Sequence, residues 1–139
     1  MGVILDSTVL VEAERGRLDM PAFLRSLGDA GVAIASITAA ELLFGVEGAE
    51  APAIRARRGA FVEALLERIP TAIYGMREAR RHAELWAELA GRGEPIGPYD
   101  MLVAATALAN DFQVATLNRR EFERVPGLAL VDLDPFFIR

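Results

Sequence analysis

The sequence contains no cysteine and no lysine, and each absence excludes a class of site. Without cysteine, the chain has no disulfide-stapled scaffold and no zinc or iron–sulfur centre held by thiolates, which fits a reducing compartment. Without lysine, every mechanism that requires a lysine amine is excluded. Histidine occurs only once, so a site built from several histidines is excluded as well.

Long apolar runs are also missing. The longest ones fall well short of the roughly 20 residues that cross a membrane, and the start MGVILD lacks the basic and extended apolar regions of a signal peptide. The hydrophobic content of 53% excludes a disordered chain. A length of 139 residues is typical of one domain. We therefore expect a cytoplasmic protein without a membrane segment, folded as a single domain over residues 1–139.

The charge balance is acidic, with a formal net charge of −5 and an isoelectric point near 4.9. This argues against a protein that holds nucleic acid mainly through a bulk positive field. It does not exclude a nuclease, because an enzyme that holds a divalent cation needs local carboxylates and can contact its substrate through local arginines. All 15 basic residues are arginine. Their use reflects either the base composition of the source genome or the bidentate contacts that arginine makes to phosphate.

Short apolar runs alternate with longer segments of helical periodicity, a pattern typical of an α/β fold with a mainly parallel sheet. The predicted strands are Val3–Leu5, Val32–Ala35, Thr71–Ile73 and Gln113–Thr116, with Leu128–Val131 as a fifth. The predicted helices cover residues 19–30, the segment that starts at Thr38, and residues 53–68, 76–90, 99–109 and 119–124. No repeat or linker divides the chain.

Four polar residues lie at the ends of these elements in apolar surroundings, where an unpartnered charge is costly. Asp6 directly follows the first strand, and Glu41 lies one turn into the helix after the second. Asp100 begins a helix that is apolar on nearly every side, and Asn118 lies just past the fourth strand. Since the carboxyl ends of parallel strands meet at one edge of a sheet, where such folds build their sites, we expect these four side chains to converge.

Three carboxylates in one pocket repel one another and shift each other's pKa unless a cation neutralises them. With oxygen ligands, no cysteine and one histidine, Mg²⁺ or Mn²⁺ is favoured over Zn²⁺. Mg²⁺ typically keeps several waters and takes one or two carboxylates directly. Because such an ion lowers the pKa of a bound water and stabilises charge on phosphate oxygens, the pattern favours phosphodiester hydrolysis.

Each of the four residues also has a purely structural interpretation. Asp6 and Asp100 are placed where helix N-termini are stabilised through the dipole and the backbone N–H groups. Glu41 is the last residue of the Thr-Ala-Ala-Glu segment that begins at Thr38, which has the form of a capping box. Asn118 is typical of a turn or an N-cap. Taken singly, the residues leave both interpretations open.

Four segments follow one another along the chain: LDSTVLVE, SITAAELLFGV, PIGPYDMLVAATAL and ATLNRREFERVPGL. Together they resemble the PIN-domain ribonucleases of the VapC toxin family, in the family's order and over nearly the whole chain. The third and fourth segments are the most specific. The resemblance implies a PIN-like three-layer α/β/α sandwich with a mainly parallel central sheet.

For function, the resemblance implies the toxin of a type II toxin–antitoxin system, a Mg²⁺- or Mn²⁺-dependent endoribonuclease that leaves 5′-phosphate and 3′-hydroxyl ends. The implied partners are an RNA substrate, a VapB-type antitoxin and a second copy in a homodimer. The family's acidic positions fall on Asp6, Glu41 and Asp100, which would hold the metal, with Ser7 beside a metal-bound water. At the fourth position Asn118 stands where many relatives have aspartate. It would orient a ligand or water, and Glu121 is the other candidate.

Other features carry less information. His82 lies among arginine and glutamate residues on a helix face and is expected to be solvated, which argues against a His-dependent ribonuclease or a Ser-His-Asp hydrolase. Arg119, Arg120 and Arg124 follow the fourth strand, where they are either ordinary surface charge or contacts to RNA phosphates.

Four large apolar side chains are expected in the core: Leu43, Phe44, Leu85 and Trp86. In the VapC family, however, helices of this region also form an apolar groove for the antitoxin, which leaves such side chains exposed until the partner covers them. The expectation for these residues is therefore tied to whether a partner is bound.

Two other functions share parts of this pattern. Phospho-receivers and phosphoaspartyl enzymes also have an aspartate after the first strand, but both employ a lysine near the phosphoryl group, and this chain has none. The alternative is a catalytically weak or inert PIN-like module that acts through antitoxin or partner binding. Asn118 at the fourth position is the only support for that alternative.

Overall fold

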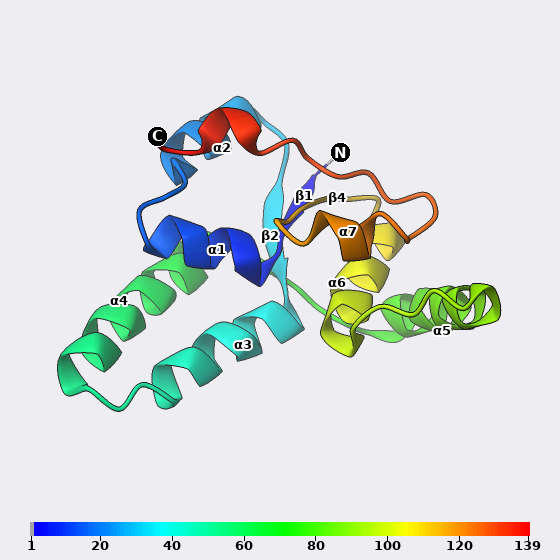
Figure 1. The fold of residues 1–139 in the computed structure, drawn as a ribbon, viewed down its shortest axis with the longest axis horizontal. Coiled ribbons are helices and arrows are strands. Elements are labelled where there is room, and N and C mark those ends of the chain that lie inside the picture. Colours follow the sequence, from blue (N-terminus) through cyan, green and yellow to red (C-terminus); the bar gives the residue numbers. More distant parts are fainter. Residues whose placement is uncertain (1) are drawn as a thin grey trace.

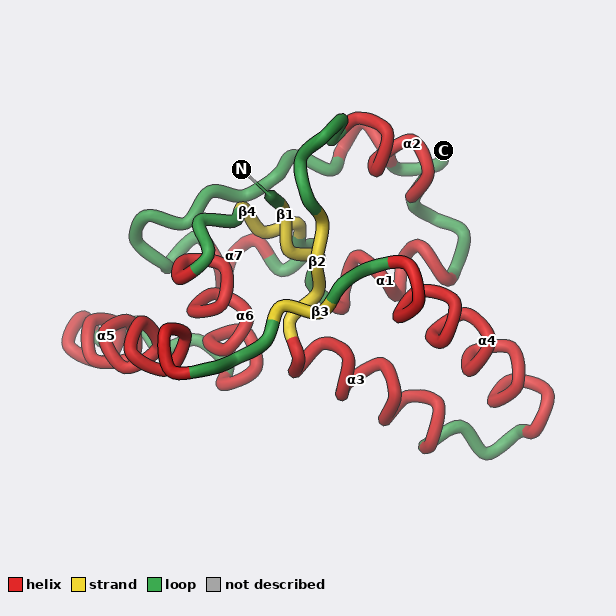
Figure 2. The backbone as a smooth tube through the Cα atoms, turned by 180° about the vertical axis from the view of Figure 1, so that it is seen from behind, coloured by secondary structure: helices red, strands yellow, loops and turns green. Residues whose placement is uncertain are grey.

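The computed structural model describes residues 2–139, and a four-stranded sheet lies at the centre of this part of the chain. The strands are β1 (Val3–Leu5), β2 (Val32–Ala35), β3 (Thr71–Ala72) and β4 (Gln113–Ala115). Their order in the sheet is β3-β2-β1-β4 (Figure 2). Every neighbouring pair is parallel. The carboxyl ends of all four strands therefore lie at one edge of the sheet.

Helices surround the sheet (Figure 1). They are α1 (Ser7–Glu14), α2 (Met20–Ser26), α3 (Ser36–Glu47), α4 (Pro52–Arg68), α5 (Met76–Arg92), α6 (Pro98–Ala109), α7 (Arg119–Phe122) and the 3₁₀ helix η1 (Asp134–Phe136). Among the helices of residues 2–139, none has the length and hydrophobicity that a membrane crossing requires.

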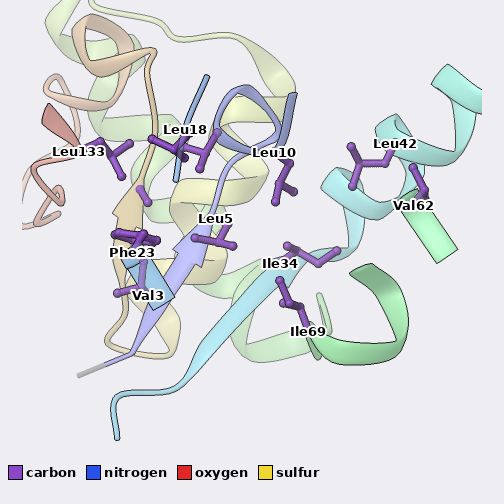
Figure 3. Close-up of a cluster of buried hydrophobic side chains, with 12 residues drawn as sticks. Val3, Leu5, Leu10, Leu18, Phe23, Ile34, Leu42, Val62, Ile69 and Leu133 are labelled. Atoms are coloured by element: carbon purple, nitrogen blue, oxygen red, sulfur yellow. The ribbon is translucent and has the colours of Figure 1, made fainter. Parts of the chain in front are cut away.

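Two hydrophobic clusters pack against opposite faces of the sheet, because neighbouring side chains of a strand point to opposite sides. Val3 and Leu5 of β1 belong to one cluster, together with buried side chains of α1, α2, α3 and α4 (Figure 3). Ile4 belongs to the other cluster, with side chains of α5, α6 and α7. This α/β/α layering around a parallel sheet confirms the predicted fold class.

Local chemistry explains where two of the helices begin and end. Asp19 caps α2 by accepting a hydrogen bond from the backbone N–H of Ala22 at 3.1 Å, and Pro21 lies in the first turn, where no N–H donor is needed. Gly93 ends α5 with a φ of +68°, the left-handed conformation that glycine adopts without strain. The predicted start of the helix at Asp19 agrees with the structure, whereas α5, predicted to end at residue 90, continues to Arg92.

Three predictions about the elements are wrong. The sequence pattern misses α1, whose eight residues STVLVEAE are too short and too apolar to show helical periodicity. The helix predicted to reach Ala30 ends at Ser26, and Gly28 follows with a φ of +58°. The fifth strand at Leu128–Val131 is only an isolated bridge from Leu130 to β4 before the chain crosses toward η1 (Figure 1).

The expectation for the four large apolar side chains holds for one of them only. Leu85 is fully buried, but Leu43, Phe44 and Trp86 are 40%, 76% and 63% exposed. Their placement in the core is therefore wrong for this chain on its own, because α3 and α5 turn them to the surface. Grouped apolar side chains on a surface are typical of sites where another molecule binds.

Core packing predicts a clear contrast between two leucines. Leu10 of α1 is fully buried in the cluster of Figure 3, whereas Leu43 is 40% exposed. We expect Leu10→Ala to lower the free energy of unfolding by about 3 kcal/mol, since it leaves a cavity, and Leu43→Ala to change it by less than about 1 kcal/mol. Urea denaturation of both variants measures this. Equal losses would contradict the described packing.

Candidate active site at the carboxyl ends of the strands

The four residues predicted to converge lie at the same edge of the sheet. Asp6 connects β1 to α1, Glu41 lies in α3 directly after β2, Asp100 is in the first turn of α6, and Asn118 precedes α7. The beginnings of these helices lie close together in Figure 1. The carboxylates of Asp6, Glu41 and Asp100 are near enough to act on one another electrostatically.

Asp6 is buried and is held by two threonine hydroxyls. Its side chain is only 3% exposed, and its Oδ2 accepts hydrogen bonds from Thr8 Oγ1 and Thr116 Oγ1, each at 2.7 Å. Although Asp6 stands at the N-cap of α1, its side chain makes no capping hydrogen bond. The structural interpretation as a helix cap is therefore wrong for this residue.

The two threonines are in turn fixed by the backbone of the segment after β4. The backbone N–H of Leu117 donates to Thr8 Oγ1 at 3.0 Å, and that of Asn118 donates to Thr116 Oγ1 at 2.9 Å. This network ties α1 to the end of β4 across the site. Sequence reasoning misses the role of Thr8 and Thr116, because only the parallel pairing of β1 with β4 brings them together.

Asp100 and Asn118 form the second fixed pair of the site. Asn118 Nδ2 donates to Asp100 Oδ2 at 2.9 Å, and the Asn118 side chain does not cap α7. Burial, together with the negative charges of Asp6 and Glu121, raises the pKa of Asp100 to about 6, and the hydrogen bond from Asn118 opposes this rise. A carboxyl group in this state carries a large unfavourable electrostatic energy.

Glu41 does not belong to a capping box. Helix α3 begins at Ser36, two residues before Thr38, so Glu41 lies beyond its first turn. The Thr38 hydroxyl is buried and has no hydrogen-bond partner. Burial raises the pKa of Glu41, and the charges of Asp6 and Asp100 raise it further. The carboxylate of Glu41 therefore faces the site and not the helix backbone.

Glu121, which the sequence leaves as an alternative to Asn118, also reaches the site. It lies in the short helix α7, and its negative charge acts on Asp100. Its Oε2 is buried without a hydrogen-bond partner. A buried carboxylate oxygen without a donor is costly, so this atom is a ready ligand for a cation. Asn118 and Glu121 thus both lie beside Asp100.

The donor set fits a hard divalent cation. Within residues 2–139, no three histidine, cysteine, aspartate or glutamate side chains are gathered tightly enough to surround one ion by themselves. Mg²⁺ does not need such a cage, because it takes one or two carboxylates and keeps several waters. The mutual repulsion of Asp6, Glu41 and Asp100 and the unpartnered Glu121 oxygen are what a bound cation would relieve.

Other predicted candidates lie outside this cluster. Arg119 donates to the Val131 carbonyl oxygen at 2.9 Å, and Arg124 donates to the Pro95 carbonyl oxygen at 2.8 Å, so both guanidinium groups brace loops. Arg120 is exposed.

His82 is half-buried, so its expected solvation is wrong. Its Nδ1 lies 2.8 Å from the Tyr74 hydroxyl, and its ring stacks on Trp86 with the centroids 5.7 Å apart. Burial lowers the pKa of His82. The ring is thus engaged in an aromatic cluster on α5 and takes no part in the carboxylate cluster.

Comparison with known proteins identifies relatives with the same arrangement of segments. The family model of the PIN domain matches residues 3–128. The tRNA(fMet)-specific endonuclease VapC of Salmonella typhimurium is 38% identical over 77% of this chain and 79% of its own length. The protein of that name from Shigella flexneri is 33% identical over 93% of this chain and 96% of its own.

Solved structures agree with these sequence relatives. The structure of VapBC2 from Rickettsia felis bound to a promoter DNA fragment contains a chain with a TM-score of 0.86 and 28% identity, covering 94% of this chain and 98% of that one. The DNA-bound VapBC of Salmonella typhimurium gives a TM-score of 0.85 at 31% identity, covering 96% and 98%. The chain therefore belongs to the PIN-domain family and, within it, to the VapC ribonucleases.

Proposed function

We propose that this protein is the toxin of a type II toxin–antitoxin pair and that it hydrolyses RNA phosphodiesters with Mg²⁺ or Mn²⁺. The observation that carries the proposal is the placement of Asp6, Glu41, Asp100 and Glu121 at one edge of the sheet, where burial and the charges of Asp6 and Glu121 raise the pKa of Asp100 to about 6. Such crowding destabilises the fold unless a cation binds there. Membership of the VapC ribonucleases supplies the reaction that the cation serves.

In this proposal Asp6, Glu41 and Asp100 hold the ion, one or two of them directly and the others through its bound waters, and Asn118 orients Asp100. When bound, the ion supplies an activated water and neutralises charge on the phosphate oxygens. Thr8 and Thr116 fix the direction of Asp6 by donating to its Oδ2, so this ligand is oriented before the ion arrives. Their hydroxyls are positioning groups that act through Asp6.

The alternative is an inert PIN-like module that works only through partner binding. Its sole support is the neutral Asn118 at the fourth position. That amide donates a hydrogen bond to Asp100, and the adjacent Glu121 offers a carboxylate. Both observations favour a working site, and a titration with Mn²⁺ that detects no binding at millimolar concentration would favour the inert module.

The proposed protein partner is a VapB-type antitoxin. The two solved structures compared above are VapBC complexes. An apolar hollow of about 460 Å³ lies between α1, α2 and α4, lined among others by Leu18, Leu24, Phe61 and Leu65. We assign this hollow to an apolar helix of the antitoxin, because helices dock in grooves of this kind through regularly spaced apolar side chains.

The proposed homodimer contact is the α5 surface, which consists of Ile73, Tyr74, Met76 and Trp86. These side chains are 76%, 37%, 67% and 63% exposed. His82 orders two of them, because it is hydrogen-bonded to Tyr74 and stacked on Trp86. Ordered aromatic side chains lose little conformational entropy when a partner covers them.

Two further predictions from the sequence remain proposals. A single domain over residues 1–139 is supported by the two clusters that share the faces of one sheet. A cytoplasmic location is supported by the absence of cysteine and by the RNA substrate that the proposal requires.

Cleavage of RNA tests the proposal directly. We expect purified protein without antitoxin to cut total cellular RNA at discrete positions with Mg²⁺ or Mn²⁺, and not with EDTA. Asp6→Asn and Asp100→Asn remove ligand charge and are expected to lower the rate by at least about a hundredfold. Asp29→Asn, at an exposed position away from the site, is the matched control. Cleavage at the parent rate by Asp6→Asn would contradict the assigned roles.

The raised pKa of Asp100 predicts that this carboxylate, which the proposed function needs, lowers the free energy of unfolding of the metal-free protein at neutral pH. Because this pKa is about 6 instead of 3.8, the folded protein binds more protons than the unfolded chain between these pH values. The free energy of unfolding of the metal-free protein therefore falls as the pH rises through this range. Asp100→Asn is expected to stabilise the metal-free protein at pH 7.5 by about 1 kcal/mol, after allowance for solvent screening, and not at pH 3.5.

Thermal unfolding of the parent and of Asp100→Asn, with EDTA and with Mn²⁺, measures this change in stability. The parent is expected to gain stability from Mn²⁺ at pH 7.5, and Asp100→Asn to lose that gain. The asparagine keeps an acceptor for Asn118, so the fold is not disturbed. A destabilised metal-free Asp100→Asn protein at pH 7.5 would show that Asp100 has a structural role instead.

The proposed dimer contact through the α5 surface predicts that a negative charge introduced there weakens the homodimer. Trp86→Glu places a carboxylate at the centre of the proposed contact and is expected to weaken the dimer by at least about tenfold. Sedimentation velocity at several concentrations measures this, with Ile138→Glu, at an exposed position near the C-terminus, as the control. A dimer that withstands Trp86→Glu but not Ile138→Glu would place the contact at the C-terminal end of the chain.

A further inference from the structure

Two hollows beside the candidate active site share Val11 of α1 as a lining residue. One, of about 460 Å³, is lined by α1 and by the segment after β4 and includes Thr8 and Asn118. The other, of about 270 Å³, lies between α1, α3 and α4 and has Glu41 in its wall. We call the second one the arginine hollow. A strand that runs from one hollow into the other passes the candidate active site.

Two guanidinium groups line the arginine hollow, from Arg15 at the end of α1 and Arg58 of α4. The side chain of Arg58 is 39% exposed; its Nε lies 3.5 Å from Glu14 Oε1, and its Nη1 donates to the Gly45 carbonyl oxygen at 3.1 Å. Arg15 is 61% exposed and lies 3.9 Å from a Glu12 oxygen. A guanidinium has five N–H donors, so both retain free ones.

An acidic protein needs local positive charge where it meets RNA. The net charge is −5, and the active-site carboxylates add to the repulsion of a phosphate backbone. Arg119 and Arg124 each donate to a loop carbonyl oxygen, and neither lines either hollow. Arg15 and Arg58 share a hollow with Glu41 and still have donors, so they can offset this repulsion beside the site.

We propose that the arginine hollow binds a phosphate of the RNA strand next to the one that is cleaved, with Arg58 and Arg15 as its ligands. This inference rests on the proposed ribonuclease function and names residues that hold its substrate. Arginine forks match the geometry of phosphate oxygens. Glu14 competes with that phosphate for Arg58, so its charge weakens RNA binding.

The binding test needs no cleavage. The affinity of a fluorescein-labelled 20-nucleotide single-stranded RNA is measured by anisotropy in EDTA at several salt concentrations. We expect Arg58→Gln to weaken binding about tenfold and to reduce the slope of log affinity against log salt by about 0.7. We expect Arg15→Gln to weaken RNA binding as well, and Glu14→Gln to tighten it. Arg57→Gln, exposed on another face of α4, is the control and leaves affinity unchanged.

Cleavage by the same variants separates binding from chemistry. With Mg²⁺, Arg58→Gln is expected to raise KM about tenfold and to change kcat by less than about threefold, because the charge lies beside the reacting phosphate. Arg58→Lys restores part of the affinity, since a point charge replaces the fork. Thermal unfolding of each variant shows whether the loss of the hydrogen bond to Gly45 disturbs the fold.

The outcomes are distinguishable. If parent and Arg58→Gln bind RNA equally and with equal salt slopes, the inference is overturned. If Arg58→Gln is unstable, unchanged binding by both Arg15→Gln and Glu14→Gln overturns it. The inference is also overturned if these variants weaken the binding of a VapB-type antitoxin but leave the affinity for RNA unchanged. A parent that never cleaves RNA but binds it through Arg58 would overturn the ribonuclease proposal and keep the phosphate site.

Discussion

The gathering of carboxylates in a partly buried site at one edge of the sheet is the constraint that the rest of this structure satisfies. Asp6, Glu41, Asp100 and Glu121 come from four separate segments, and burial together with the neighbouring negative charges raises the pKa of Asp100 and Glu41. The fold holds them together because β1, β2 and β4 are parallel, so the segments that follow these strands begin at the same edge. The hydrophobic clusters on both faces supply the free energy that this arrangement costs.

The location of the site was predictable from the sequence, and its internal contacts were not. Residues that directly follow a strand, such as Asp6, are placed by topology alone. The threonine pair around Asp6 depends on the register of β1 against β4, which no local pattern encodes. Likewise, Thr38 and Glu41 have the spacing of a capping box, but Ser36 already begins the helix. Periodicity identified apolar helix faces without showing whether the chain itself covers them, so Phe44 and Trp86 were misplaced.

The net charge and the local charges of this protein have different effects on RNA binding. A net charge of −5 keeps RNA from binding nonspecifically over the surface, which leaves recognition to individual contacts. Arg119 and Arg124, near the site, donate to backbone carbonyl groups of loops. The arginines that share a hollow with Glu41 are Arg15 and Arg58, to which we assign the proposed phosphate contact. Discrimination among RNAs then depends on how a strand fits past the carboxylates, and less on overall attraction.

Helix α4 connects this phosphate site with the proposed antitoxin site. Arg58 lines the arginine hollow, and Phe61 and Leu65, three and seven residues later, line the apolar hollow between α1, α2 and α4. Residues at these spacings lie on the same face of a helix. The lining of the apolar hollow at Phe61 therefore comes within about one helical turn of Arg58. An antitoxin placed there can exclude RNA by covering one arginine, and it need not contact the metal ligands at all.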